Sequence, residues 1–252
     1  MLTSVATVKA ISIPIALAVL LVFLFRQSAP AWRSLAPFLF GGWGAFSLNS
    51  AILRSLPPVL PPDQLYANTP SQAFLCAFVE SAIPEEFAKG IWILLLLFVW
   101  RRYFSRHAAY IGGLLGLGFA MRENLAYAQT AEEWRVLAVF CHGAWGAIAG
   151  HLLQGAIDTT PLRIWKFLWA IVPSILLHGL LNTTIFLVEV YDPTTVDTLL
   201  EDDLNDEVSP ALLIPMLGTC AVTIFSWVWA IKIIELNRRQ KQNDAVFISK
   251  TE

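Results

Sequence analysis

Residues 81–99 read SAIPEEFAKGIWILLLLFV. The second half of this stretch is wholly apolar, whereas the first half carries Glu85, Glu86 and Lys89. Proline is tolerated in the first turn of a helix, so a helix that starts at Pro84 places both glutamates where the helix dipole favours negative charge. The stretch therefore predicts a membrane-spanning helix with ionisable groups near one end.

Further apolar runs of spanning length lie on both sides of this stretch. The seven candidate spans are residues 10–26, 34–54, 71–100, 108–129, 134–157, 164–189 and 210–235. Each is long enough to cross a bilayer as a helix. We expect an all-α fold, a polytopic transmembrane helical bundle of about seven spans. It would form one domain over residues 1–236, with a catalytic core at 71–190 and a polar cytoplasmic tail at 237–252.

The composition supports a membrane protein. Of the 252 residues, 56% are hydrophobic and 14% are charged, whereas soluble domains carry roughly 25% charged residues. This composition excludes a disordered protein, a nucleic-acid binder with a basic stripe and an ordinary cytosolic enzyme. The three cysteines are far apart in apolar runs and form no disulfide framework or zinc-finger spacing.

The basic residues predict the orientation. If the seven spans alternate, twelve of the 17 lysines and arginines fall on one side, and only Lys9, Arg54 and Arg135 fall on the other. Because cytoplasmic loops are enriched in lysine and arginine, we expect the N-terminus outside and the C-terminus in the cytoplasm. The acidic loop at 189–207 would lie outside, as a solvated face, and the expected location is a bacterial plasma membrane.

Ionisable groups inside four consecutive spans predict a shared site. Each such group costs roughly 2.5–3.5 kcal/mol on insertion, so it must face a protein interior or a wet cavity. Spans one, two and seven carry none at mid-depth. The polar residues of spans three to six are Glu80, Glu85, Glu86, Lys89, Arg122, Glu123, Asn124, His142, His151, His178 and Asn182. Their distances from the span ends predict that Glu85 or Glu86, Glu123, His142 and His178 meet in the outer half of the membrane. His151 faces away from His142 and is expected to be structural.

The spacing within each helix agrees with a common site. Lys89 follows Glu85 by four residues and Glu86 by three, so it can reach either carboxylate, and Asn182 follows His178 by four. Small residues recur every fourth position on the same faces of spans four and five, where they allow close helix packing. These are Gly112, Gly116 and Ala120 in one span and Gly146 and Gly150 in the next.

At these residues the sequence resembles the PrsW family of intramembrane proteases, which is grouped with CAAX prenyl proteases and bacteriocin-processing membrane proteins. The family's Glu-Glu-x-x-Lys motif matches residues 85–89, and a Gly-rich helix ending in Glu-Asn matches residues 118–124. A histidine with a glycine eight residues later matches 142–150, and Leu-His-Gly matches 177–179. Asn182 stands where similar sequences often have aspartate. The resemblance covers about residues 71–190, and spans one, two and seven carry no part of it.

The resemblance implies proteolysis within the membrane by a glutamate-based centre. Glu85 or Glu86 would activate a water molecule, and Glu123 with His142 would position that water or bind a metal. His178 would donate a hydrogen bond to the tetrahedral oxyanion. Lys89, Asn124 and Asn182 would support the site, Asn182 also as an oxyanion donor.

The resemblance leaves two versions of this centre. In one version, a divalent metal such as zinc is held by members of the set Glu85, Glu86, Glu123, His142 and His178. In the other version, Lys89 supplies the charge compensation and no metal is needed.

Other functions are compatible with the same residues. Glutamate and histidine chains also mark proton relays, so a proton-coupled transporter is an alternative, although no repeated half is present. A further alternative is an interaction or immunity protein whose polar core only fixes helix packing. Among proteases, a prenyl-protein endopeptidase is an alternative, and it would need a site open to the cytoplasm.

The expected partners are the lipid bilayer and a single-pass membrane protein or peptide substrate such as an anti-sigma factor, which would be cut near the outer face. No nucleic acid is expected as a partner.

Overall fold

The computed structural model describes residues 4–24, 34–61, 67–99, 107–126, 135–159, 164–191, 217–233 and 235–236. All regular secondary structure within these ranges is helical, which confirms the all-α fold class. The elements are α1 (Ser4–Leu24), η1 (Ala36–Gly41), α3 (Gly42–Ser55), α4 (Pro70–Leu75), η2 (Cys76–Ala82), α5 (Ile83–Val99), α7 (Ala108–Ala126), α8 (Arg135–Thr159) and α9 (Ile164–Tyr191). A further apolar helix spans Leu217–Ile233.

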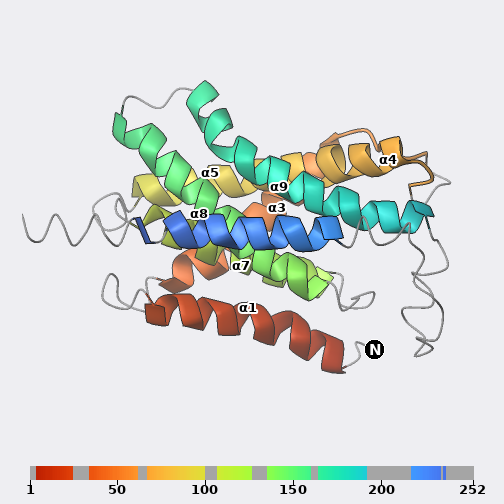
Figure 1. Cartoon of the computed structure of the whole chain (residues 1–252). Coiled ribbons are helices and arrows are strands. Elements are labelled where there is room, and N and C mark those ends of the chain that lie inside the picture. Colours follow the sequence, from red (N-terminus) through yellow and green to blue (C-terminus); the bar gives the residue numbers. More distant parts are fainter. Residues whose placement is uncertain are drawn as a thin grey trace, which may run out of the picture.

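The long helices run roughly side by side in one bundle (Figure 1). Helix α1 lies along one edge, α9 lies along the opposite edge, and α7 and α8 lie between them (Figure 1). Nearly every side chain of α7 is buried, which makes α7 the centre of the bundle. Helices α5 and α8, which carry site residues, pack against α7, and α9 packs on α5, η2 and α8.

Glycine permits the close approach of α7 and α8. A Cβ atom at Gly116 would overlap the backbone carbonyl of His142, and one at Gly112 would overlap the carbonyl of Gly146. Among the described elements, these two helices share the most extensive contact. The predicted small-residue faces are confirmed, and the contact at Gly116 fixes the height of His142 along α7.

The predicted span at 71–100 consists of three successive helical pieces. Thr69 caps α4 by accepting a hydrogen bond from the backbone N–H of Gln72 at 3.2 Å. The π-helical turn η2 follows, and α5 begins at Ile83, one residue before Pro84. A proline lacks the N–H that continues a helical ladder, and a π-helical turn is a common way to accommodate this loss. The expected restart of the helix at this proline is thus confirmed to within one residue.

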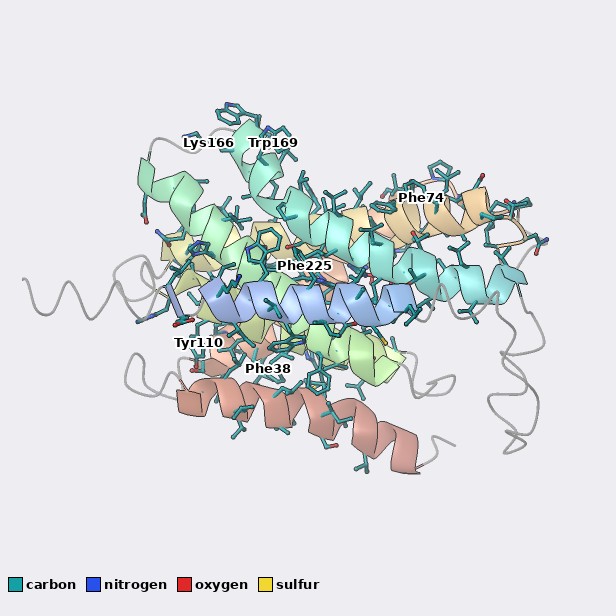
Figure 2. All side chains as sticks on the ribbon, in the orientation of Figure 1. Phe38, Phe74, Tyr110, Lys166, Trp169 and Phe225 are labelled. Atoms are coloured by element: carbon teal, nitrogen blue, oxygen red, sulfur yellow. The ribbon has the colours of Figure 1, made fainter. Side chains whose placement is uncertain are left out.

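The outer surface of the bundle is apolar. Phe74, Trp169 and Phe225 project from α4, α9 and helix 217–233 and are about half or more exposed (Figure 2). Lys166 lies near Trp169 at one end of α9 (Figure 2), a combination that is typical of the boundary between lipid and water. Such a surface is suited to contact with hydrocarbon chains rather than with water.

The structure tests the number of spans only in part. One described helix, Ile164–Val188 within α9, is long and apolar enough to cross a membrane, and Ile11–Val22 and Leu217–Ile233 are shorter apolar helices. Helices α3 and α5 have 14 and 17 residues, and each directly continues a π-helical segment, η1 and η2 respectively. The span count and the orientation stay predictions. The acidic loop from 192 to 207, the tail at 237–252 and most of the basic residues that predict the orientation lie outside the described residues.

Candidate active site

The first turn of α5 carries the two glutamates of the predicted site. Glu85 and Glu86 are buried, with 6% and 1% of their surfaces exposed. They lie at the positive end of the helix, where unpaired backbone N–H groups favour negative charge. Because an uncompensated buried carboxylate is costly, the groups around the pair decide its chemistry.

Lys89 lies one turn further along α5 and is fully buried. Its Nζ atom is 2.5 Å from Oε1 of Glu86 and 3.9 Å from Oε2 of Glu85. The same nitrogen is 2.9 Å from Nδ1 of His142. An ammonium group has only N–H donors, so Nδ1 of His142 accepts this hydrogen bond. Lys89 therefore compensates the carboxylate charge and connects α5 to α8.

His178 on α9 lies against the same pair of glutamates. Its Nδ1 atom is 3.0 Å from Oε1 of Glu86, and its Nε2 atom is 3.9 Å from Oε2 of Glu85. Asn182 donates from Nδ2 to Nε2 of His178 at 3.1 Å. The proton of His178 is therefore on Nδ1 and is donated to Glu86, while the lone pair of Nε2 lies on the side of Glu85.

Ser81 connects Asn182 to Glu85. The Ser81 hydroxyl donates to Oε1 of Glu85 at 3.0 Å and accepts from Nδ2 of Asn182 at 2.7 Å. Ser81 belongs to η2, directly before α5. This chain of hydrogen bonds holds Oε1 of Glu85 and so fixes the direction of Oε2.

His142 pairs with the predicted glutamate of α7. Its Nε2 atom is 3.1 Å from Oε2 of Glu123. Because Nδ1 of His142 accepts from Lys89, Nε2 carries the proton and donates it to Glu123. Each histidine of the cluster thus donates one ring N–H to a carboxylate, His142 to Glu123 and His178 to Glu86.

Two buried carboxylate oxygens in the cluster have no hydrogen-bond partner. These are Oε2 of Glu85 and Oε2 of Glu86. Each glutamate is held through Oε1, so the second oxygen is left for another interaction. Since about nine in ten buried polar atoms in proteins are hydrogen-bonded, two such exceptions in one cluster indicate a functional site.

The structure brings together seven of the predicted side chains and places others elsewhere. Glu80 accepts a hydrogen bond from the backbone N–H of Val59 and does not face the cluster. Arg122 stacks over an aromatic ring of α3, and His151 is half-buried and makes no described contact with the cluster. Asn124 is buried, but the hydrogen bonds described for the cluster do not include it. The convergent set is Glu85, Glu86, Lys89, Glu123, His142 and His178, with Asn182 as a supporting member.

Sequence reasoning missed several polar groups near the cluster. Trp145 stacks on His178 at a centroid distance of 4.4 Å, and its Nε1 donates to Ser226 at 3.0 Å. Ser81 holds Glu85, as described above. Helix 217–233, which was expected to carry no part of the site, thus supports it through Ser226. Single serines and tryptophans in apolar helices carry no spacing signal, so only the fold could reveal them.

The donor set in the cluster fits a divalent metal. Glu85, His142 and His178 each offer one ligand atom, and these atoms lie within 4.8 Å of one another. One carboxylate and two imidazoles form a common ligand set of catalytic zinc. Metal-binding histidines almost always donate their other ring N–H to an outer acceptor, and Glu86 and Glu123 occupy those outer positions here. In this arrangement the Lys89 ammonium lies against the same two groups, His142 and Glu85, that a metal cation would contact.

Comparison with known protein families gave a match. A family model described as PrsW family intramembrane metalloprotease matches residues 29–200. The match begins before α3, so the expectation that span two carries no part of the resemblance was wrong. No curated protein and no solved structure matched the chain.

Proposed function

The chain belongs to the PrsW family of intramembrane metalloproteases, and from this premise we propose how its polar cluster hydrolyses a peptide bond. The protein is a membrane-embedded peptidase, and its substrate is a membrane protein within the bilayer. We assign the reaction to the cluster at the start of α5. Glu85, His142 and His178 would hold a divalent metal, and Glu86 would accept the proton of the attacking water.

The observation that carries this assignment is the pairing of the two histidines. His178 donates to Glu86 at 3.0 Å and His142 donates to Glu123 at 3.1 Å. In both rings the other nitrogen accepts a hydrogen bond, from Lys89 in His142 and from Asn182 in His178. A bound metal would replace these two donors at the ring nitrogens, and Oε2 of Glu85, which has no hydrogen-bond partner, would be its third ligand. The three candidate ligand atoms of Glu85, His142 and His178 lie within 4.8 Å of one another, which supports a shared ligand over a purely structural polar core.

A bound metal would supply a Lewis acid that polarises the scissile carbonyl and favours ionisation of water. The remaining work falls to the side chains. Water attacks the carbonyl carbon, Oε2 of Glu86 accepts the water proton, and the new C–O bond gives a tetrahedral intermediate. Glu86 then returns that proton to the amide nitrogen as the C–N bond breaks, so the carboxyl and amine products form without a covalent enzyme intermediate.

Lys89 and Glu123 complete the charge arrangement. The ammonium of Lys89 favours negative charge on the intermediate because it is buried, where electrostatic interactions are strong. Glu123 holds the ring of His142 and is the most exposed carboxylate of the cluster, at 19% of its side chain.

Asn182 uses Nδ2 on both Ser81 and His178. We therefore assign it to positioning rather than to the oxyanion role that the resemblance implies.

The substrate class and the membrane arrangement are part of the proposal. We propose a multi-pass protein of a bacterial plasma membrane, with the N-terminus outside, that cuts a single-pass membrane protein such as an anti-sigma factor near the outer face. The bias of basic residues supports the orientation, and the exposed apolar side chains of the bundle support contact with lipid.

The test uses the full chain in lipid vesicles with a library of quenched fluorescent peptides. Each peptide contains about 20 apolar residues, enough to span the bilayer, and a short polar flank. The wild type should cleave some members, and Glu86→Gln should lower kcat by about 10²–10⁴-fold, the usual contribution of general-base catalysis.

Glu80→Gln is the matched control for this test. It makes the same chemical change six residues away, and the new amide oxygen can still accept from Val59. Cleavage by Glu86→Gln at the wild-type rate per folded molecule would exclude Glu86 as the base. Failure of the wild type to cleave any member would exclude the proposed substrate class.

A further inference from the structure

The carboxamide of Asn49 is a buried polar group without a role in the assignment above. Asn49 lies on α3 and is 5% exposed. Its Oδ1 atom is buried and has no hydrogen-bond partner. Leaving such an acceptor unsatisfied is destabilising, so its presence calls for an explanation beyond packing.

Other polar side chains of α3 show what a structural role looks like. The hydroxyls of Ser47, Ser50 and Ser55 each donate to the backbone carbonyl four residues earlier, at 2.9, 2.9 and 3.0 Å. These groups are satisfied within their own helix. Asn49 is the buried exception on the same helix.

The packing of α3 places Asn49 at the level of the active-site cluster. Gly42 lies against the backbone of Gly118 on α7, and Gly44 lies against Trp92 on α5. Further along the chain, α3 therefore runs beside α7 toward Glu123 and against the direction of α5. Two turns after Gly42, about 10 Å along the axis, α3 has reached the height of the cluster.

The facing of Asn49 agrees with this position. The buried residues of α3 are Gly42, Ala45 and Asn49, and their spacing of three and four puts them on one face of the helix. Phe119 joins this region to the cluster, because its ring lies 5.7 Å from the ring of Phe46 and 4.5 Å from Nζ of Lys89. At Phe46, only the ring of Phe119 separates α3 from Lys89. Asn49 lies about one helical turn further along α3.

We propose that Asn49 is a substrate-binding residue that hydrogen-bonds the peptide backbone beside the bond to be cut. A transmembrane segment must lose its helical hydrogen bonds locally before a peptidase can attack it. The freed N–H and C=O groups are costly in an apolar environment unless they find partners. A carboxamide offers both an acceptor and a donor, so Oδ1 of Asn49 can accept from a substrate N–H.

This inference rests on the proposed function for the location of the reacting bond, but its test does not need catalysis. The binding arm measures the Kd of the vesicle-bound fluorescent peptides for chains that carry Glu86→Gln, with and without Asn49→Ala. The kinetic arm measures kcat and KM of Asn49→Ala with the peptide that the wild type cleaves fastest. We expect Kd and KM to rise by about 5- to 30-fold, the effect of losing one buried hydrogen bond to the substrate, with kcat nearly unchanged.

Two further variants separate binding from folding. Asn49→Leu has a similar volume and removes the unsatisfied acceptor, so its thermal midpoint should equal or exceed that of the wild type while KM rises. Ser50→Ala is the matched control, because it removes a polar group of α3 that is bonded within its own helix, and its KM should not change.

Unchanged Kd and KM in Asn49→Ala, or a loss of binding that follows a lowered thermal midpoint in both Asn49 variants, would overturn the inference. A fall in kcat alone would also overturn it, because Asn49 would then act on the reaction and not on binding. Absence of binding by every peptide would count against the inference as well. If the wild type binds but does not cleave, and Asn49→Ala weakens that binding, the proposed function fails, and what stands of the inference is that Asn49 hydrogen-bonds a bound transmembrane peptide.

Discussion

Nζ of Lys89 lies 2.5 Å from Oε1 of Glu86, and neither side chain reaches solvent. This ion pair is buried in the middle of the helical bundle. Breaking such a pair from one side leaves an uncompensated charge and costs about 3–5 kcal/mol, whereas replacing both partners is often nearly neutral. The pair therefore contributes to folding as well as to chemistry.

Lys89→Met should lower the free energy of unfolding by about 3–5 kcal/mol, because it leaves the Glu86 carboxylate without its cation. The double variant Lys89→Met, Glu86→Gln should recover much of that loss. Denaturant titration of the purified chain in detergent, as a double-mutant cycle, measures the coupling. Additive effects of the two changes would show that the ion pair contributes nothing to stability.

Ser81→Ala should lower kcat with little change in KM. The Ser81 hydroxyl fixes Oε1 of Glu85, so its loss lets the carboxylate rotate, and small misplacements of reacting groups cost about 10²-fold. Ser81→Thr keeps the hydroxyl and should restore most of the rate. If Ser81→Thr is as impaired as Ser81→Ala, then the position tolerates only serine for packing reasons and the hydrogen bond is not the cause.

Ser226→Ala tests whether helix 217–233 supports the active site. It leaves Nε1 of Trp145 without its acceptor at 3.0 Å, and Trp145 is stacked on His178. We expect kcat to fall by about 10-fold, because a small displacement of His178 misplaces a group of the active site. Ser226→Thr keeps the hydroxyl and should restore kcat. Cys220→Ser, an exposed change on the same helix, is the control, and an equal loss in this variant would argue for a general effect on the helix.

Some of the site residues could be predicted from the sequence, and others could not, for physical reasons. The ionisable residues of four helices are readable because burial in lipid is costly, and the glycine faces of α7 and α8 are readable because close packing needs small residues at every fourth position. Ser81 and Asn49 are not readable. A serine or asparagine in an apolar helix is usually satisfied by its own backbone, as Ser50 is, and only tertiary packing decides otherwise.

The same limit applies to the span count. Apolar length predicts seven spans, but the predicted span at 34–54 contains the π-helical segment η1 before α3, and the one at 71–100 contains η2 between α4 and α5. Hydropathy records composition and does not record where a helix ends. The break before Pro84 was partly readable, because proline is the residue that interrupts a helical ladder.

Gly116→Ala should destabilise the bundle and impair activity. The added methyl group would overlap the carbonyl of His142, so α7 and α8 must separate, and overpacking of this kind costs about 1–3 kcal/mol. Gly155→Ala on α8 is the matched control, since a Cβ atom there meets nothing within 4 Å. Because alanine is the better helix former, this control should be neutral or stabilising by up to about 1 kcal/mol. Thermal unfolding of both variants measures the difference, and equal effects would mean that the close approach at His142 is not required.

The final prediction concerns the metal. If Glu85, His142 and His178 are ligands, the purified chain should contain about one zinc ion per molecule, measured by elemental analysis after dialysis against metal-free buffer. His178→Ala and Glu85→Gln should each lower that content, whereas Glu86→Gln should retain the metal and lose activity, because Glu86 is assigned to proton transfer. His151→Ala removes a half-buried histidine of α8 that lies outside the cluster and should change neither quantity.

A chelator should abolish cleavage, and added zinc should restore it. Full activity of a metal-free chain would instead mean that Lys89, which lies 2.9 Å from His142, supplies the positive charge of the centre by itself. Glu85, whose Oε2 has no hydrogen-bond partner, would then be the base.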